Sequence, residues 1–480
     1  MNKKMIRFIV GTLLFIEGVL LLLPAVTAVI YREWKMLYIF LGTVVLCALL
    51  SFLLARKRPE NTKFYATEGY MSVALCWVIM SIFGAIPLFL SGYYNNPVDA
   101  LFETVSGFTT TGATVRADVE VLPHAVLLWR SLTHWIGGMG VLVFIMAVLP
   151  VSGESSMHLM KAESPGPSVG KLVPKVRKTA LMLYKLYILL TLAEIVALVA
   201  AGATVFEAVN LSCSTAGTGG FGLLNSSCGE YNVAMRVVIT VFMILFGVNF
   251  NVYFLLYIRN FKDAFKCEEV RYYLGTILAA SLVICINIRS LYATWGEASL
   301  HSFFQVGSII TTTGFSTADF DKWPQLSRTI LVLLCFIGAC AGSTGGGMKV
   351  SRVILMVKTI GKEISTITHP RVVKKVRLEG KPVEHEVLRS VNVFIMAYTC
   401  IFVISWLIIS LDGMSFTTNF TSVTVTINNI GPGLEMVGPT GNFKEFSNLS
   451  KLVFSFDMLA GRLEIFPMLI LCTPSTWRKR

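Results

Sequence analysis

The chain has 480 residues, of which 54% are hydrophobic and 14% are charged, and its formal net charge is +13. Soluble proteins carry about 25% charged residues, so this composition excludes a soluble globular protein and indicates a polytopic membrane protein. The positive charge does not indicate nucleic-acid binding, because the lysines and arginines lie in the gaps between apolar runs.

Residues 1–65 are expected to form two N-terminal transmembrane helices. The apolar run from Phe8 to Tyr31 follows a basic N-terminus. It is longer than a signal-peptide core of about 7–15 residues and reaches the roughly 20 residues that a spanning helix needs. A second run, Met36–Leu54, leads back to basic residues. Glu17 lies within the first run, either as a functional carboxylate or as a paired structural group.

Beyond residue 65 one pattern occurs four times: a long apolar helix, a half-length helix, a Thr/Gly-rich segment and a second long helix. We assign repeats 1 to 4 to residues 66–178, 179–268, 269–388 and 389–480. The first long helices are expected at Ser72–Ser91, Ala180–Ala201, Tyr272–Ile288 and Val391–Leu411. The half-length helices are expected at Val98–Phe108, Val205–Cys213, Ser299–Ile310 and Phe416–Ile427. The second long helices are expected at Leu132–Leu149, Val233–Ile258, Ser327–Ile360 and Lys451–Leu471.

The Thr/Gly-rich segments are the strongest sign of internal repetition. The Thr-Thr-Thr-Gly run ending at Gly112 aligns without a gap with the run ending at Gly314. Ser214–Phe221 and Asn428–Gly433 match them by layout more than by letters. Non-helical backbone is tolerated in a membrane only where it is buried in protein or lines a watery cavity. The sequence therefore predicts an all-α polytopic membrane protein with four pseudo-symmetric repeats around one pore.

Basic residues gather in the loops on one side of the predicted membrane. Under the positive-inside rule this side is cytoplasmic, which places both termini inside, predicts ten crossings and puts the Thr/Gly segments near the outside. These loops cover residues 3–7, 56–63, 161–178, 259–271, 349–389 and 477–480. The largest, Lys349–Arg389, offers a basic surface for a docking partner or for anionic lipid.

The Thr/Gly segments have the chemistry of a selectivity filter for a monovalent cation. Such an ion crosses without its water only where protein oxygens replace it, as rings of backbone carbonyls from four loops do. Glycine permits the backbone angles that turn carbonyls inward, and the C-terminal end of each half-helix favours a cation. The candidate residues that coordinate this ion are Thr111, Gly112, Thr218, Gly219, Gly220, Thr313, Gly314, Asn429, Ile430 and Gly431.

The register of repeat 2 is open at this stage. Aligning Phe221 with Phe315 favours Gly220 as its filter glycine. Aligning Thr218 with the threonines before Gly112 and Gly314 favours Gly219 instead.

A glycine-rich stretch, residues 338–349, interrupts the last helix of repeat 3. Each glycine costs a helix about 1 kcal/mol relative to alanine, so the helix is expected to stop there. A phosphate-binding loop is disfavoured because Met348 occupies the position of the required lysine. A flexible break and an intramembrane loop both remain possible readings of the residues alone.

Arg462 lies in the middle of the last apolar helix of repeat 4, near Asp457 and Glu464. An arginine at that depth costs at least ~2.5 kcal/mol, so it must face water, a carbonyl or a carboxylate. It is either a positive charge in the pore or part of a structural pair. His124 and His134 have no ligand spacing and are interpreted as interfacial.

The sequence does not indicate an enzyme or a bound cofactor. An intramembrane enzyme would need a motif such as HExxH or GxSxG, and neither occurs. The ten cysteines include no CxxC pair, and a disulfide between Cys213 and Cys228 is left open.

Over its whole length the chain resembles the Trk/Ktr/HKT superfamily of potassium transporters, in particular the TrkH-type membrane subunit. The motifs that carry the resemblance are Thr109–Thr114, Ser214–Phe221, Thr311–Thr317, Asn428–Gly433 and Gly342–Lys349. The resemblance implies potassium uptake across the bacterial inner membrane by a homodimer, with a cytoplasmic nucleotide-binding Trk regulatory subunit as partner. Potassium is then the transported substrate.

The resemblance also implies roles for individual residues. The loop formed by Gly342, Ser343, Thr344, Gly345, Gly346 and Gly347 would obstruct the pore and move on gating. Arg462 would set a barrier below the filter. In this superfamily a serine at the first filter glycine goes with sodium transport, so Gly112 favours potassium. A sodium-permeable transporter or a proton- or sodium-coupled symporter is the alternative function.

Overall fold

The computed structural model describes residues 2–57, 59, 66–140, 176–371 and 375–477. The described residues are helical almost throughout. Among them a single pair of short antiparallel strands, β1 (Arg377–Leu378) and β2 (Lys381–Pro382), lies near the end of repeat 3. The prediction of an all-α polytopic membrane protein is therefore confirmed.

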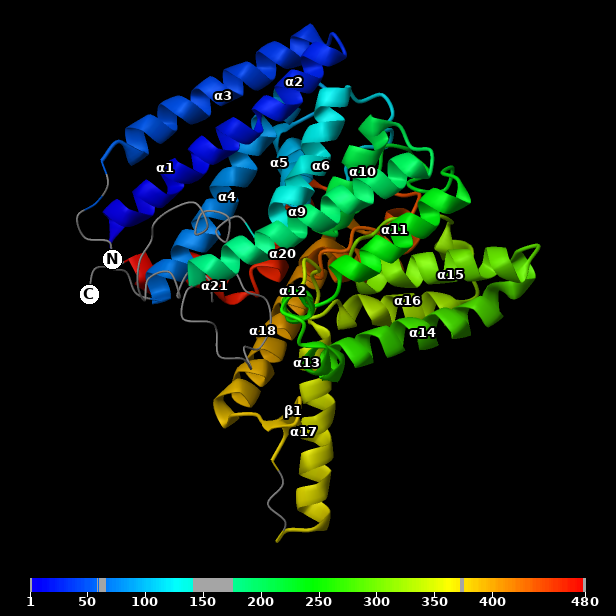
Figure 1. Ribbon diagram of the computed structural model, residues 1–480. Coiled ribbons are helices and arrows are strands. Elements are labelled where there is room, and N and C mark those ends of the chain that lie inside the picture. The colour runs from blue at the N-terminus through cyan, green and yellow to red at the C-terminus, as the bar shows by residue number, and fades with distance from the viewer. Residues whose placement is uncertain (1, 58, 60–65, 141–175, 372–374, 478–480) are drawn as a thin grey trace.

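Three N-terminal helices precede the repeats. They are α1 (Lys3–Leu20), α2 (Leu22–Ile30) and α3 (Trp34–Ala55). In Figure 1 they form a blue layer at one edge of the molecule, where α1 packs against α3 and α4. Glu17 is buried in this layer beside Gly84 of α4, and its carboxylate oxygens have no hydrogen-bond partner among the described residues.

Each of the four repeats contains a long helix, a half-length helix and a broken or short final helix. Repeat 1 consists of α4 (Ala66–Ser91), α5 (Pro97–Phe108) and α6 (His124–Gly138). Repeat 2 consists of α9 (Val176–Ala200), α10 (Val205–Gly217), α11 (Val233–Phe246) and α12 (Phe250–Tyr257). Repeat 3 consists of α14 (Glu268–Ile288), α15 (Trp295–Ile310), α16 (Gln325–Ile337) and α17 (Val350–Thr368). Repeat 4 consists of α18 (His385–Ile409), α19 (Phe416–Ile427), α20 (Asn448–Arg462) and α21 (Phe466–Cys472).

Short elements connect these helices. They are α13 (Phe261–Lys266), α22 (Pro474–Trp477), η1 (Arg289–Leu291), η2 (Phe320–Lys322), η3 (Ser410–Asp412) and η4 (Glu435–Val437).

The half-length helices begin at residues that cap helix N-termini. The caps are Asn96, Thr204, Thr294 and Ser415, and each side chain accepts a hydrogen bond from the backbone N–H three residues later. Asn, Thr and Ser are favoured there because their oxygens satisfy otherwise unpaired N–H groups. Thr204 and Glu207 form a complete capping box. Local sequence therefore fixes where each half-length helix starts, and so where its other end lies.

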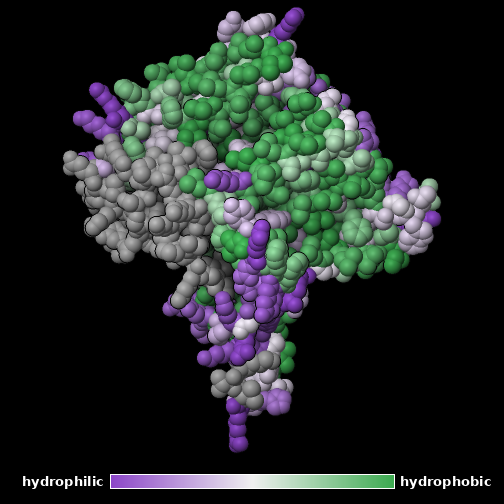
Figure 2. Space-filling model, in the orientation of Figure 1, coloured by the Kyte–Doolittle hydropathy of each residue, from purple (hydrophilic) through white to green (hydrophobic). Residues whose placement is uncertain are grey.

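Six helical segments in the described part of the chain are long and apolar enough to cross a membrane, or seven if the bent pair α11 and α12 counts as one span. These six are Lys3–Ile30, Trp34–Ala55, Thr67–Ser91, Leu181–Ala200, Glu268–Leu291 and His385–Asp412. The final helices of the repeats are shorter, so the ten predicted crossings stay a prediction. Figure 2 shows an apolar surface over the main body and a largely hydrophilic projection, where Figure 1 places α17.

Two helices expected to be continuous are broken. The expected helix Val233–Ile258 stops at Phe246 and resumes at Phe250 with a bend of 89°. Gly247 packs at the break against Tyr273, and Asn249 caps the new helix by accepting from the N–H of Asn251.

The expected helix Lys451–Leu471 stops at Arg462, because Glu464 and Ile465 have left-handed φ values of 58° and 69°. Of the expected helix Leu132–Leu149, residues 141–149 lie outside the described residues. Residues 338–349 separate α16 from α17, so the chain leaves the helix there as its glycine content predicts.

Candidate ion-binding site

The four Thr/Gly segments share one backbone conformation. Each contains a non-glycine residue with left-handed φ, followed two positions later by a glycine with positive φ. The first set is Thr110 (58°), Thr218 (56°), Thr312 (60°) and Asn429 (57°). The second set is Gly112 (78°), Gly220 (77°), Gly314 (83°) and Gly431 (96°). Left-handed φ is uncommon for non-glycine residues, so this recurrence identifies structurally equivalent positions in the four repeats.

In backbone conformation, Gly220 is the repeat-2 counterpart of Gly112, Gly314 and Gly431. Gly220 has the positive φ of the other three glycines, whereas Gly219 occupies the position of Thr111 and Thr313. Gly219 is constrained by a different contact, because a Cβ there would lie 2.2 Å from Nδ1 of His134. Of the two adjacent glycines in repeat 2, Gly220 therefore leaves room for Thr313 O and Gly219 leaves room for the imidazole of His134.

The four segments close into a ring through contacts between a glycine and a carbonyl. At each equivalent glycine a Cβ would collide with, or crowd, the carbonyl oxygen of the preceding position in the next repeat. The distances from that Cβ are 1.9 Å for Gly112 to Gly219 O, 2.0 Å for Gly220 to Thr313 O, 1.9 Å for Gly314 to Ile430 O and 2.7 Å for Gly431 to Thr111 O. Repeat 1 thus contacts repeat 2, repeat 2 contacts repeat 3, repeat 3 contacts repeat 4, and repeat 4 contacts repeat 1, which closes the ring.

Side chains behind the ring tie its members together. The hydroxyls of Thr109 and Thr111 lie 2.9 Å apart, and those of Thr311 and Thr313 lie 2.7 Å apart. The amide of Asn429 donates to Thr111 Oγ1 at 3.0 Å, which joins repeat 4 to repeat 1. These groups are fully buried, so their geometry is set by protein contacts rather than by solvent.

A cavity of about 100 Å³ lies against one face of the ring. The four ring glycines line it, together with the loops that follow them, including Thr114, Arg116, Asn225 and Asn442. Backbone hydrogen bonds join these loops from repeat to repeat, at 2.8 Å from Phe443 N to Thr114 O and at 2.8 Å from Cys228 N to Ser316 O.

Asp118 lies between two residues that line this cavity, Ala117 and Val119, and is itself not among the lining residues. The side-chain amide of Asn225 donates to Asp118 at 2.9 Å, and this hydrogen bond holds the pKa of that carboxyl group below its usual range. Asp118 is therefore ionised at neutral pH.

The glycine-rich loop 338–349 lies against the other face of the ring. Gly346 N–H donates to Thr312 Oγ1 at 2.6 Å. A Cβ on Gly345 would lie 2.8 Å from Thr311 O, and one on Gly346 would lie 2.6 Å from Asn428 O. The loop touches the residues that precede the ring glycines, whereas the cavity is lined by the glycines and the residues that follow them. The ring thus separates the cavity from the loop.

The break in the last helix of repeat 2 receives this loop. Cys340 N–H donates to Gly247 O at 3.1 Å, and Phe250 N–H donates to Gly342 O at 3.0 Å. Glu269 clamps both ends of the loop, because its Oε1 accepts from Ala341 N at 2.7 Å and from Ser351 N at 3.1 Å. This cradle was not expected, since the sequence predicts one continuous helix over Val233–Ile258.

Arg462 holds the loop from the opposite side. Its guanidinium donates to Thr344 O at 2.7 Å and to the carbonyls of Gly137 and Gly138 at 2.5 and 2.7 Å. Of the two carboxylates near it in sequence, Asp457 accepts from Ser405 at 2.7 Å and Glu464 pairs with Arg352. Arg462 therefore links the loop to the end of α6 through backbone carbonyls.

The remaining expectations concern two histidines and two cysteines. His134 was expected at the interface, and this is wrong: it is fully buried, with its ring stacked on Phe221 at 4.2 Å. His124 lies at the start of α6, stacked on Tyr31, and is partly exposed. Cys213 and Cys228 are both buried free thiols.

Residues 36–479 match the TrkH family of cation transport proteins. The chain belongs to this family. The chain is 36% identical to the Trk system potassium uptake protein TrkH of Salmonella typhimurium and 33% identical to the Trk system potassium uptake protein TrkG of Escherichia coli, in each case covering 100% of both chains. Its fold matches the crystal structure of the potassium transporter TrkH from Vibrio parahaemolyticus with a TM-score of 0.89 and 33% identity over 100% of both chains. A TrkH-family protein is a transporter rather than an enzyme.

Gly219 and His134 are expected to be energetically coupled. A methyl group at residue 219 would overlap the imidazole, and overpacking of this kind typically costs about 1–3 kcal/mol. Gly219→Ala should lower the melting temperature of the purified protein in detergent. His134→Ala should be mildly destabilising, and the double variant should melt well above the value expected from adding the two effects.

Gly275→Ala is the matched control, because no atom lies within 4 Å of a Cβ at that helical position. Its melting temperature should equal or exceed that of the wild type, because alanine is the better helix former. Strictly additive effects of Gly219→Ala and His134→Ala would contradict the proposed contact.

Proposed function

We propose that this protein mediates potassium uptake across the bacterial cytoplasmic membrane through a selectivity filter formed by the ring. The observation that carries the proposal is the closed cycle of glycine-to-carbonyl contacts, in a chain whose full-length relatives are named potassium uptake proteins. The proposed filter comprises Thr111, Gly112, Thr218, Gly219, Gly220, Thr313, Gly314, Asn429, Ile430 and Gly431. Potassium is the transported substrate.

The chemistry of the ring suits a dehydrated monovalent cation. The carbonyls of residues 111, 219, 313 and 430 lie at the contacts between neighbouring repeats, where they can replace an ion's water. The half-length helices α5, α10, α15 and α19 end at the ring, so their partially negative C-termini converge on it. Both effects favour a cation and neither requires a charged side chain in the filter.

We infer that the loop Gly342–Gly347 is the gate and that Arg462 is a barrier beneath the filter. The loop contacts the inner face of the ring through Gly346, and Arg462 holds it through Thr344 O. An arginine with its charge directed at carbonyls below a cation filter opposes the passage of cations. Opening then requires the loop to leave the break in repeat 2.

We place the control of this gate on the cytoplasmic side. The helix α17 follows the loop directly and extends away from the body of the protein, and the basic segment 349–389 includes it. A conformational change in α17 would therefore act on the loop through the chain itself. This surface is proposed as the docking site of a cytoplasmic nucleotide-binding Trk regulatory subunit, on a homodimer with N- and C-termini in the cytoplasm of the inner membrane.

Gly112→Ser and Gly314→Ser are expected to raise sodium permeability or to abolish the preference for potassium. At both positions a Cβ would lie 1.9 Å from the neighbouring carbonyl oxygen, so that carbonyl must move. The measurement is rubidium and sodium uptake by proteoliposomes that contain equal amounts of folded protein. Gly275→Ser is the control, because no atom lies within 4 Å of its Cβ position. Unchanged selectivity in both ring variants would count against the filter, and equal permeability in the wild type would favour the sodium-permeable alternative.

Arg462→Ala and a shortened Gly342–Gly347 loop are each expected to raise rubidium flux in the absence of any cytoplasmic partner. Both changes remove the hydrogen bond from Arg462 to Thr344 O that holds the loop below the ring. Arg271→Ala removes an exposed arginine and should leave basal flux unchanged. If flux stays at the wild-type level in both gate variants, the gate lies elsewhere.

A further inference from the structure

A buried ion pair lies behind the ring segment of repeat 1. Glu103 of α5 and Arg130 of α6 have side chains that are 0% and 3% exposed. Arg130 Nε and Nη2 donate to Glu103 Oε1 at 3.0 and 2.9 Å. A buried pair of this kind is weak evidence for stability, because desolvation of the two charges opposes their attraction. Its placement therefore points to another role.

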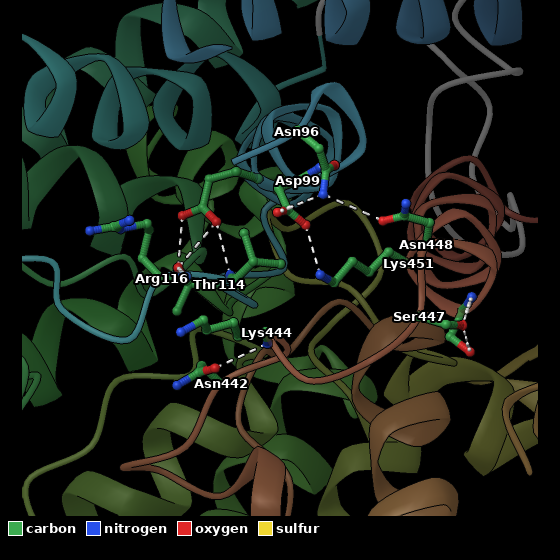
Figure 3. A network of polar contacts seen from close by, with 12 residues as sticks. Asn96, Asp99, Thr114, Arg116, Asn442, Lys444, Ser447, Asn448 and Lys451 are labelled. Carbon is green, nitrogen blue, oxygen red and sulfur yellow. Dashed lines mark hydrogen bonds and ion pairs between the residues drawn. The ribbon is translucent and has the colours of Figure 1, made fainter. Parts of the chain in front are cut away.

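Glu103 holds the chain immediately after the ring glycine of its own repeat. Its Oε2 accepts from Val115 N–H at 3.1 Å, and its Oε1 accepts from Thr114 Oγ1 at 2.9 Å. Thr114 appears in Figure 3 with its hydrogen bonds to this carboxylate. A change in the carboxylate would therefore act on the ring through three residues of backbone.

The other repeats tie down the same stretch with neutral groups. The residues equivalent to Glu103, nine positions before the ring glycine, are Leu211, Gln305 and Ser422. The neutral ties are Ser214 Oγ to Phe221 O at 3.0 Å, Ser308 Oγ to Phe315 O at 2.6 Å and Leu434 N to Thr421 Oγ1 at 3.2 Å. Ser106, the counterpart of Ser214 and Ser308, has a buried hydroxyl without a hydrogen-bond partner within the described ranges. In repeat 1 the carboxylate of Glu103 thus makes the hydrogen bonds that a hydroxyl makes in the other three repeats.

Arg130 extends the pair to repeat 2 and to the cavity. Its guanidinium lies over the ring of Phe221 at 4.1 Å, and Phe221 directly follows the ring glycine Gly220. Arg130 also lines the cavity on the outer face of the ring, and its Nη1 has no hydrogen-bond partner in the described part of the chain. A positive charge is thus held at the cavity that a cation must cross, and Glu103 is the carboxylate bound to it.

We propose that Glu103 and Arg130 are specificity-determining residues that set the electrostatic potential at the outer face of the filter. This inference rests on the proposed function. With both charges present, a cation in the cavity meets a neutral pair. Removal of either charge alone leaves the other uncompensated beside the ion path, so the two single substitutions must shift cation access in opposite directions. A purely structural pair would shift it in the same direction.

The test compares Glu103→Gln, Arg130→Gln and the double variant in proteoliposomes. Rubidium uptake is measured over a range of concentrations at constant ionic strength, per amount of protein that elutes as folded in size-exclusion chromatography. Glu103→Gln should raise the half-saturating concentration roughly three- to fivefold, and Arg130→Gln should lower it by a similar factor. The double variant should return to within about twofold of wild type. It should also lower the rubidium-to-sodium ratio, because glutamine offers one acceptor oxygen where Glu103 uses two to hold Thr114 and Val115.

The chain offers a matched control on the same pore helix. Asp99 lies one turn before Glu103 and pairs with Lys451 of α20 at 2.7 Å, with side chains 11% and 5% exposed. Figure 3 shows this pair with Asn96 and Asn448 around it. Neither Asp99 nor Lys451 lines the cavity. Asp99→Asn and Lys451→Gln should therefore leave the half-saturating concentration within about twofold of wild type.

Two results would overturn the inference: shifts of the same sign in both single variants, or no shift in either. If one single variant fails to fold, the sign of the other decides, and if both fail, the ion ratio of the double variant decides. The variant Gly314→Ser distinguishes failure of this inference from failure of the proposed filter. A changed ion ratio in Gly314→Ser with no effect at Glu103 or Arg130 removes only the role of the pair. An unchanged ratio in both Gly314→Ser and Gly112→Ser removes the proposed filter as well.

Discussion

The contact between a glycine and the neighbouring carbonyl is the constraint on which the rest of the structure depends. At three of the four contacts a Cβ would lie 2.0 Å or less from that oxygen, so no residue with a side chain fits without displacing the ring. Close approach of this kind brings four carbonyls to one place, which a soluble turn does not need. The half-length helices, their N-caps and the residues behind the ring all hold the four segments at that separation.

The ring also explains why the final helices of the repeats are broken. A continuous helix would fill the space beneath the ring, where loop 338–349 lies. In repeat 2 the chain bends by 89° between α11 and α12, and the backbone groups freed at the bend bond to Cys340 and Gly342 of the loop. In repeat 4 the chain leaves the helix after Arg462, whose guanidinium meets the carbonyls left free at the end of α6. Each break therefore satisfies its polar backbone groups through another repeat, as a low-dielectric setting demands.

Much of this arrangement could be predicted from the sequence, because local signals carry it. Asn96 and Ser415 mark helix starts by chemistry that depends on three or four residues, and the bounds expected for Phe416–Ile427 were met. The register of Gly220 could not be predicted, since it depends on the left-handed φ of Thr218 rather than on the spacing of letters. The buried position of His134 could not be predicted, because its imidazole packs against Gly219, which is 85 residues away in the chain. Glu103 and Arg130 could have been noticed as charged residues in apolar runs, but the sequence does not show that they pair with each other.

Fourfold similarity of the backbone does not extend to the side chains around it. A strictly symmetric ring would place the same group behind every segment, and four buried carboxylates around one axis would repel one another strongly. A single chain can vary each repeat independently, so it can place one charged pair in repeat 1 and hydroxyls in repeats 2, 3 and 4. The loop 338–349 shows the same freedom, because repeat 3 alone supplies it while repeats 2 and 4 hold it through Phe246 O and Arg462. Fusion of four repeats into one polypeptide thus allows a symmetric carbonyl ring to coexist with an asymmetric set of charges and a glycine-rich loop on one side.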